Sequence, residues 1–357
     1  MDTFWNRLPT SHGGAQEDIR RLGASGLPLV LYGDGWYAPY VREYLKRRGH
    51  APAAVFTDDG FTSSGEAVDF AEVSRRFPKF AVVIAFANAS LARKKLARLG
   101  VNAARVFFFD VMGELLNNAI DRAWLEGRKA RFDAAYGLLA DGLSRDTFEA
   151  FLAAKLGAAG EPLAAVWRKE QYFPREIVKL SRSEVFVDGG AYTGDTLLTF
   201  LRLTGGAYAR YCAFEPEPRN AATLKATVEK RALRGVSVHN KGLWSAPAAL
   251  PFAVRHGTSA SAVSAGGETS VEAETIDRAA PDATFIKLDI EGAELEALKG
   301  AAAAIKRNRP TLAVCVYHRP GDLFEIPLFI SALVPDYHFY LRQHQPVACE
   351  TVLYAVP

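Results

Sequence analysis

One stretch decides the fold of the C-terminal half of this chain: Glu184-Val185-Phe186-Val187-Asp188-Gly189-Gly190-Ala191-Tyr192-Thr193-Gly194-Asp195-Thr196. The apolar run at residues 185–187 predicts a short buried strand, and the glycines after it predict a sharp turn that leads into a helix. A strand, a glycine-rich turn and a helix in this order form the first unit of a nucleotide-binding α/β sheet. We therefore expect a ligand on the backbone between Gly189 and Gly194.

The acid at the end of this strand, Asp188, indicates which ligand to expect. The usual dinucleotide pattern is G-x-G-x-x-G, whereas this turn has Gly189, Ala191 and Gly194 at those positions. A carboxylate is a poor neighbour for a pyrophosphate but suits a cationic ligand that has no phosphate. S-adenosylmethionine (SAM) carries a sulfonium and an ammonium, so the turn predicts a methyltransferase. The alternative is an ordinary turn with a solvated Asp188.

The composition of the whole chain gives broad limits. Its 357 residues predict two or three domains, and its net charge of +3 gives no reason to expect nucleic acid or an acidic membrane surface as a partner. Its three cysteines, Cys212, Cys315 and Cys349, lie far apart without metal-ligand or redox spacing, so we expect a reducing cytoplasm. No apolar run reaches the roughly 18 residues that a membrane span needs.

Three regions follow from the order of the expected elements. Strands and helices alternate up to about residue 120, which predicts a small parallel α/β domain at residues 1–120. Helical periodicity predicts a helical connector at residues 121–180. Residues 181–357 alternate again and end in two paired strands, which predicts an antiparallel hairpin added to a parallel sheet. The Ser/Ala/Gly-rich stretch 257–267 predicts a mobile loop over the site.

The first domain contains a second glycine turn. Gly33, Gly35 and Ala38 fit G-x-G-x-x-A, and Asp58 lies 23 residues after Gly35, near the position of a ribose-binding acid. This pattern supports an alternative function, an oxidoreductase or epimerase that binds NAD(P) or a nucleotide sugar here. Asp34 opposes it by placing a negative charge in the turn. The other alternative is that this domain serves docking or association into a homo-oligomer.

Two further strand ends in the C-terminal half predict contacts with SAM. Glu215 ends the strand at residues 211–214, and an acid at this place can accept hydrogen bonds from both hydroxyls of a ribose. Asn240 and Gly242 leave the strand at residues 236–239, where adenine lies in folds of this class.

The last two strand ends predict residues on the acceptor side. Lys287 and Asp289 end the strand that begins at Phe285. Lys287 within an apolar strand is costly without a partner, which Asp289 or Glu291 can supply. His318 follows the next strand, and because a histidine has a pKa of about 6.5, it is the expected general base. A divalent ion held by Asp289, Glu291 and His318 is the alternative.

Over residues 181–357 the chain resembles the FkbM family of SAM-dependent methyltransferases. The resemblance rests on residues 187–196, 214–216, 286–294 (I-K-L-D-I-E-G-A-E), 317–320 and 350–354. It implies a class I Rossmann-like methyltransferase fold with a seven-stranded mixed sheet, SAM as methyl donor, and usually O-methylation of a sugar or a natural-product hydroxyl.

We therefore expect an in-line methyl transfer from SAM to the hydroxyl of a small-molecule or saccharide acceptor, assisted by a general base. The expected catalytic residues are His318, Lys287 and Asp289. The expected SAM-binding residues lie in the turns at the strand ends: Asp188, Gly189, Gly190, Ala191, Gly194, Glu215, Asn240, Gly242 and Asp289.

Overall fold

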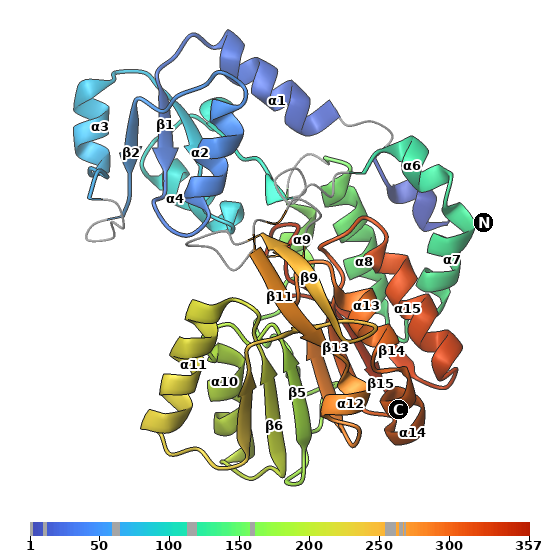
Figure 1. Cartoon of the computed structure of the whole chain (residues 1–357). Coiled ribbons are helices and arrows are strands. Elements are labelled where there is room, and N and C mark those ends of the chain that lie inside the picture. Colours follow the sequence, from blue (N-terminus) through green and yellow to red (C-terminus); the bar gives the residue numbers. More distant parts are fainter. Residues whose placement is uncertain are drawn as a thin grey trace. The chain divides into compact units, whose positions relative to one another are not determined.

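Figure 1 shows a computed structural model of the chain, which describes residues 3–9, 13–58, 65–112, 120–157, 161–253, 262–263, 267 and 269–357. The chain forms two compact units. Unit 1 consists of Met1–Arg128, Arg145–Lys169 and Gln343–Cys349, and unit 2 of Lys129–Ser144, Glu170–Arg342 and Glu350–Pro357. The division into 1–120, 121–180 and 181–357 stays a prediction, and most of the expected loop at 257–267 lies outside the described residues. No helix in those ranges is both long and apolar enough to cross a membrane.

Unit 1 is built on a parallel four-stranded sheet in the order β2-β1-β3-β4. Its strands are β1 (Leu29–Tyr32), β2 (Ala54–Phe56), β3 (Ala81–Ile84) and β4 (Val106–Phe107). Its helices include α1 (Gly13–Ala24), α2 (Ala38–Lys46), α3 (Phe70–Arg76), α4 (Ala89–Arg98), α6 (Arg122–Glu126) and α9 (Pro162–Val166). All residues of β1 and β3 are buried, which explains their unbroken apolar sequences. Because β2 and β3 lie on opposite sides of β1, the carboxyl ends of β1 and β3 flank the point where the strand order reverses.

Unit 2 contains a seven-stranded sheet in the order β14-β15-β13-β12-β5-β6-β7. The strands are β5 (Val185–Gly189), β6 (Arg210–Phe214), β7 (Val236–His239), β12 (Phe285–Leu288), β13 (Thr311–Cys315), β14 (His338–Gln343) and β15 (Thr351–Val356). Strand β15 runs antiparallel to β13, whereas β12, β5, β6 and β7 pair in parallel. The predicted seven-stranded mixed sheet is confirmed.

The helices of unit 2 cover both faces of this sheet. In Figure 1, α10 and α11 lie beside β5 and β6, and α13, α14 and α15 lie on the other side. Their bounds are α10 (Asp195–Thr204), α11 (Pro218–Lys230), α12 (Ile276–Ala279), α13 (Glu294–Lys299), α14 (Ala302–Asn308) and α15 (Asp322–Leu333). A stack of aromatic rings fills the core, with Phe186 4.9 Å from Tyr211 and 4.7 Å from Phe285 between ring centroids.

Two peripheral helices and a small sheet complete the fold. Helix α7 (Lys129–Gly137) packs on α15 in unit 2, and α8 (Gly142–Lys155) carries the chain across the division at Arg145. A sheet in the order β10-β9-β11-β8 follows β7 in the sequence. Its strands are β8 (Gly242–Leu243), β9 (Ala248–Ala253), β10 (Ala262–Val263) and β11 (Thr269–Glu274).

Candidate active site

A buried ion pair fixes the glycine turn after β5. Strand register places Lys287 of β12 opposite Asp188 of β5, and Lys287 Nζ lies 3.0 Å from Asp188 Oδ1. The same ammonium donates hydrogen bonds to the carbonyl oxygens of Gly189 (3.1 Å) and Gly190 (2.8 Å). The Tyr211 hydroxyl donates to Asp188 Oδ2 at 2.5 Å. The partner of Lys287 is thus Asp188, and the expectation that Asp289 or Glu291 would pair with it was wrong.

This pair changes how Asp188 and Lys287 can act. Their side chains are 0% and 2% exposed, so neither offers its charge to a ligand directly. Burial lowers the pKa of Lys287, but the carboxylates of Asp188 and Asp289 together outweigh that effect and the pKa is raised, so Lys287 stays charged. The two residues hold the turn in place. Carboxylates other than Asp188 must therefore contact a cationic ligand.

The glycines of the turn are required by close packing. Gly190 has a φ of +74°, and a Cβ there would lie 1.9 Å from the carbonyl oxygen of Asp289. Gly194 has a φ of +98°, and its Cβ would lie 2.6 Å from Leu224 Cδ1. The backbone N–H groups of Gly190 and Ala191 both donate to the carbonyl oxygen of Phe214. A larger residue at either glycine would therefore displace the turn from the neighbouring strand ends.

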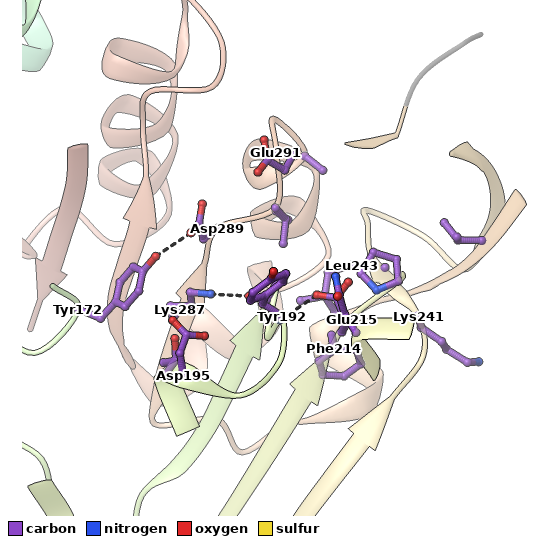
Figure 2. Close-up of a pocket in the computed structure, with 18 of the residues that line it drawn as sticks. Tyr172, Tyr192, Asp195, Phe214, Glu215, Lys241, Leu243, Lys287, Asp289 and Glu291 are labelled. Carbon is purple, nitrogen blue, oxygen red and sulfur yellow. Dashed lines mark hydrogen bonds between the residues drawn. The ribbon is translucent and has the colours of Figure 1, made fainter. Parts of the chain in front are cut away.

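A cavity of about 300 Å³ opens at the carboxyl ends of β5, β6 and β12 (Figure 2). Five predicted site residues line it: Gly190, Glu215, Gly242, Lys287 and Asp289. Six others do not: Asp188, Gly189, Ala191, Gly194, Asn240 and His318. Glu291, which the sequence suggested as a partner of Lys287 or a metal ligand, also lines it, together with residues that were not among the predicted site residues: Gln171, Tyr172, Tyr192, Asp195 and Glu350.

One end of the cavity suits a nucleoside. Glu215 is 6% exposed, and its two oxygens accept hydrogen bonds from the N–H groups of Tyr192 and Glu217, both at 2.9 Å. Burial raises the pKa of its carboxyl. Leu243 lines the same cavity, and its side chain supplies an apolar surface. Asn240 donates to the carbonyl oxygens of Glu215 and Pro216, so it supports the loop that carries Glu215.

The other end of the cavity carries three carboxyl groups: Asp289, Glu291 and Glu350. The Tyr172 hydroxyl donates to Asp289 Oδ2 at 2.7 Å, as drawn in Figure 2. Burial raises the pKa of Asp289, but the positive charges of Lys287 and His318 and the hydrogen bond from Tyr172 together outweigh it, so the pKa is lowered. Burial raises the pKa values of Glu291 and Glu350 to about 7. Two of these groups therefore titrate near neutral pH.

His318 is buried beside these carboxyl groups and does not itself line the cavity. Its Nδ1 is 2.9 Å from Glu294 Oε1, and its Nε2 is 3.5 Å from Glu291 Oε2 and 3.6 Å from Asp289 Oδ1. Burial lowers the pKa of His318, but Glu294 and the other two carboxylates outweigh it and raise the pKa to about 10. The ring is therefore a cation at neutral pH, with no lone pair ready to accept a proton. A divalent ion, the alternative raised by the sequence, would have to displace that proton.

Backbone strain is concentrated around this cavity. Six non-glycine residues in the described part of the chain have a left-handed φ, and four of them line the cavity: Tyr172, Tyr192, Glu291 and Glu350, with φ between +46° and +62°. Each costs about 1–3 kcal/mol and persists only where the surrounding structure enforces it, which is typical of functional sites. Glu291 and Glu350 belong to stretches that carry the family resemblance, but neither stretch indicated that Glu350 or Tyr172 would reach the cavity.

Comparisons with known proteins found a family model and solved structures that resemble this chain. Residues 188–343 match the family model described as the Methyltransferase FkbM domain. A methyltransferase FkbM structure from Methylobacillus flagellatus KT is 24% identical, has a TM-score of 0.69, and the match covers 98% of this chain and 94% of that one. No curated protein matches by sequence. The structure from Methylobacillus therefore shares its fold with almost the whole chain.

Two solved structures match about half of the chain. A SAM-dependent methyltransferase from Aquifex aeolicus is 14% identical with a TM-score of 0.30, and the match covers 49% of this chain and 84% of that one. Fibrillarin from Aeropyrum pernix, in complex with SAM, is 12% identical with a TM-score of 0.31, and the match covers 51% of this chain and 71% of that one.

Proposed function

We propose that this chain is a methyltransferase of the FkbM family, whose model matches residues 188–343, and that it transfers a methyl group from SAM to a hydroxyl oxygen of a small-molecule or saccharide acceptor. One observation carries the proposal. A single cavity joins Glu215, an acid suited to a ribose, to Glu291, a carboxyl group whose pKa is about 7.

SAM would occupy the cavity from Glu215 to Asp289. Glu215 accepts hydrogen bonds from the ribose hydroxyls with the lone pairs that remain beside its two backbone donors and the Asn220 side chain. Leu243 packs against the adenine, and the backbone at Gly190 borders the methionine part. Asp195 and Asp289 line the cavity and supply the negative charge that suits the sulfonium and the ammonium. They take over the role that the sequence had suggested for Asp188, whose charge is neutralised by Lys287.

The acceptor would lie between the SAM methyl group and Glu291. A lone pair of the acceptor oxygen attacks the methyl carbon, the carbon–sulfur bond breaks, and S-adenosylhomocysteine leaves with the electron pair. The proton of the hydroxyl passes to Glu291. A base with a pKa of about 7 is about half ionised at neutral pH, which suits this transfer. His318, predicted as the base, instead keeps its positive charge beside Glu291 and lowers the pKa of that carboxyl.

Labelled methyl transfer tests this function. The full chain is incubated with methyl-labelled SAM and an extract of host cells, and the labelled product is isolated and analysed by mass spectrometry. We expect a methyl ether on a saccharide or another hydroxyl compound. A labelled methylamine or C-methyl product would refute O-methylation but keep SAM as the donor, whereas no labelled product from any fraction would refute the methyl transfer itself.

A further inference from the structure

Unit 1 contains a second cavity, of about 360 Å³, that the methyl transfer does not use. We infer that it binds a neutral saccharide. Its lining comes from the segments after β1 and β3, from α4 and from two distant segments: Tyr32, Trp36, Phe86, Ala87, Asn88, Leu91, Ala92, Lys95, Trp167, Gln345 and Pro346. This inference is independent of the function proposed for unit 2.

The fold places this cavity where a ligand site is expected. Tyr32 and Trp36 lie at the carboxyl end of β1, and Phe86 and Asn88 lie at the carboxyl end of β3. These two strand ends flank the reversal of strand order in the sheet β2-β1-β3-β4. Connections that leave a parallel sheet in opposite directions open a crevice at this point, and ligands of α/β sheets bind there.

Exposed aromatic surface is concentrated at this cavity. Seven large apolar side chains in the described part of the chain are at least 36% exposed, and three of them line it: Trp36 (52%), Leu91 (53%) and Trp167 (39%). Apolar surface of this kind is costly in water unless something covers it. The faces of indole rings are the usual platforms for the C–H faces of sugar rings.

Both indole rings are held in place. The Trp167 indole N–H donates a hydrogen bond to the carbonyl oxygen of His344 at 2.9 Å. Trp36 makes edge contacts with Tyr37 and Tyr40, at 5.4 Å and 6.3 Å between ring centroids. Because these rings have little freedom to lose, a flat apolar ligand face can bind to them at a low entropic cost.

The polar groups of the cavity favour a neutral ligand with hydroxyls. Lys95 is ion-paired with Asp58, which also accepts a hydrogen bond from the Tyr32 hydroxyl at 2.8 Å. The charges of Lys95 and Asp58 cancel, yet their side chains are 41% and 49% exposed and can still hydrogen bond. Asn88 and Gln345 add amide groups. This mixture of an apolar platform and several donors and acceptors matches a sugar.

The glycine turn next to the cavity opposes a dinucleotide. Gly33 has a φ of +120°, and a Cβ there would lie 2.9 Å from the ring of Phe86, so this glycine is explained by close packing of Phe86. Asp34 is only 5% exposed and lies 3.6 Å from Arg42, which places a carboxylate inside the turn. Packing of Phe86 explains Gly33, and the buried carboxylate of Asp34 is unfavourable for a phosphate in this turn.

Titrations of the full chain test this inference. Tryptophan fluorescence and calorimetry would be recorded with D-glucose, D-galactose, D-mannose, N-acetyl-D-glucosamine and their β-linked disaccharides, and separately with NAD and UDP. We expect saturable binding of at least one saccharide, and Trp36→Ala should raise its Kd at least about tenfold. Trp124→Ala is the matched control, because Trp124 lies on α6 of unit 1 and does not line the cavity.

Two results would overturn the inference. One is the absence of binding for every saccharide up to about 10 mM, with circular dichroism showing that the chain is folded. The other is binding of NAD or UDP that Trp36→Ala abolishes. SAM affinity should be equal in the wild type and in Trp36→Ala, so failure here is distinguishable from failure of the methyltransferase proposal.

Discussion

The two glycine turns of this chain are similar in sequence, but different residues surround them in the structure. Each follows a fully buried parallel strand and has a buried acid at the junction, Asp188 near the end of β5 and Asp34 just after β1. In unit 2 the acid pairs with Lys287 on the neighbouring strand, and carboxyl groups line the adjacent cavity. In unit 1 the acid lies near Arg42 of its own following helix, and the adjacent cavity is aromatic. A strand–turn–helix motif therefore marks where a ligand can bind, and the residues on neighbouring strand ends decide which ligand it is.

If Glu291 has no chemical role, the cavity of unit 2 does not differ from that of unit 1 in the way described above. We expect Glu291→Gln to lower methyl transfer by about 10²- to 10⁴-fold, because the acceptor proton loses its base. SAM affinity should stay within a few-fold of the wild type, since Glu291 lies at the acceptor end. Labelled-SAM turnover and calorimetry measure the two effects, and Glu229→Gln on the exposed face of α11 is the control. Wild-type turnover in Glu291→Gln would remove this residue from the mechanism.

The two acids also differ in what their partners contribute to stability. Lys287→Met leaves Asp188 buried without a counter-charge and should lower the free energy of unfolding by about 3–5 kcal/mol. Arg42→Met should cost about 1 kcal/mol or less, because the Arg42 side chain is 35% exposed and the pair is longer. Urea denaturation measures both. Equal losses would mean that the two turns are held by similar forces.

The pH dependence of turnover tests whether His318 is the base or a charge that acts on Glu291. Replacing the charged ring by Gln removes a charge that lowers the pKa of Glu291, so the acid limb of the pH–rate profile should move upward, on the order of one pH unit. Turnover should recover at higher pH. If His318 were itself the base, His318→Gln would be inactive across the whole profile.

A smaller effect concerns stability against pH. The pKa of His318 rises from 6.5 in the unfolded chain to about 10 in the folded one. Its contribution to stability is therefore complete below pH 6.5 and is lost as the pH rises toward 10. Between about pH 7.5 and 9.5, the free energy of unfolding should fall by up to about 1.4 kcal/mol per pH unit more in the wild type than in His318→Gln. Equal slopes would contradict the raised pKa.

Much of the fold followed from local patterns. The stretch from Val185 to Thr196 predicted a strand, a turn and a helix, and the last two strands predicted the mixed sheet; both are confirmed. The partner of Lys287 could not be found this way, because it depends on the register between β12 and β5, which lie about 100 residues apart in the sequence.

The acceptor end of the cavity was harder to predict for a similar reason. Tyr172 and Glu350 reach it from segments that are remote from the glycine turn, and no periodicity marks them. The expectation for His318 rested on the pKa of an isolated imidazole. Three carboxylates from the segment 289–294 surround the ring in the folded chain and keep it charged, an effect that appears only once their positions are known.

The most direct test of the central claim is calorimetric titration of SAM into the full chain and into Glu215→Ala. We predict one SAM site per chain, at least about tenfold weaker binding in Glu215→Ala, unchanged binding in Glu229→Gln, and no heat of binding with NADH. Failure of the wild-type chain to bind SAM, or NADH binding that competes with it, would contradict the account.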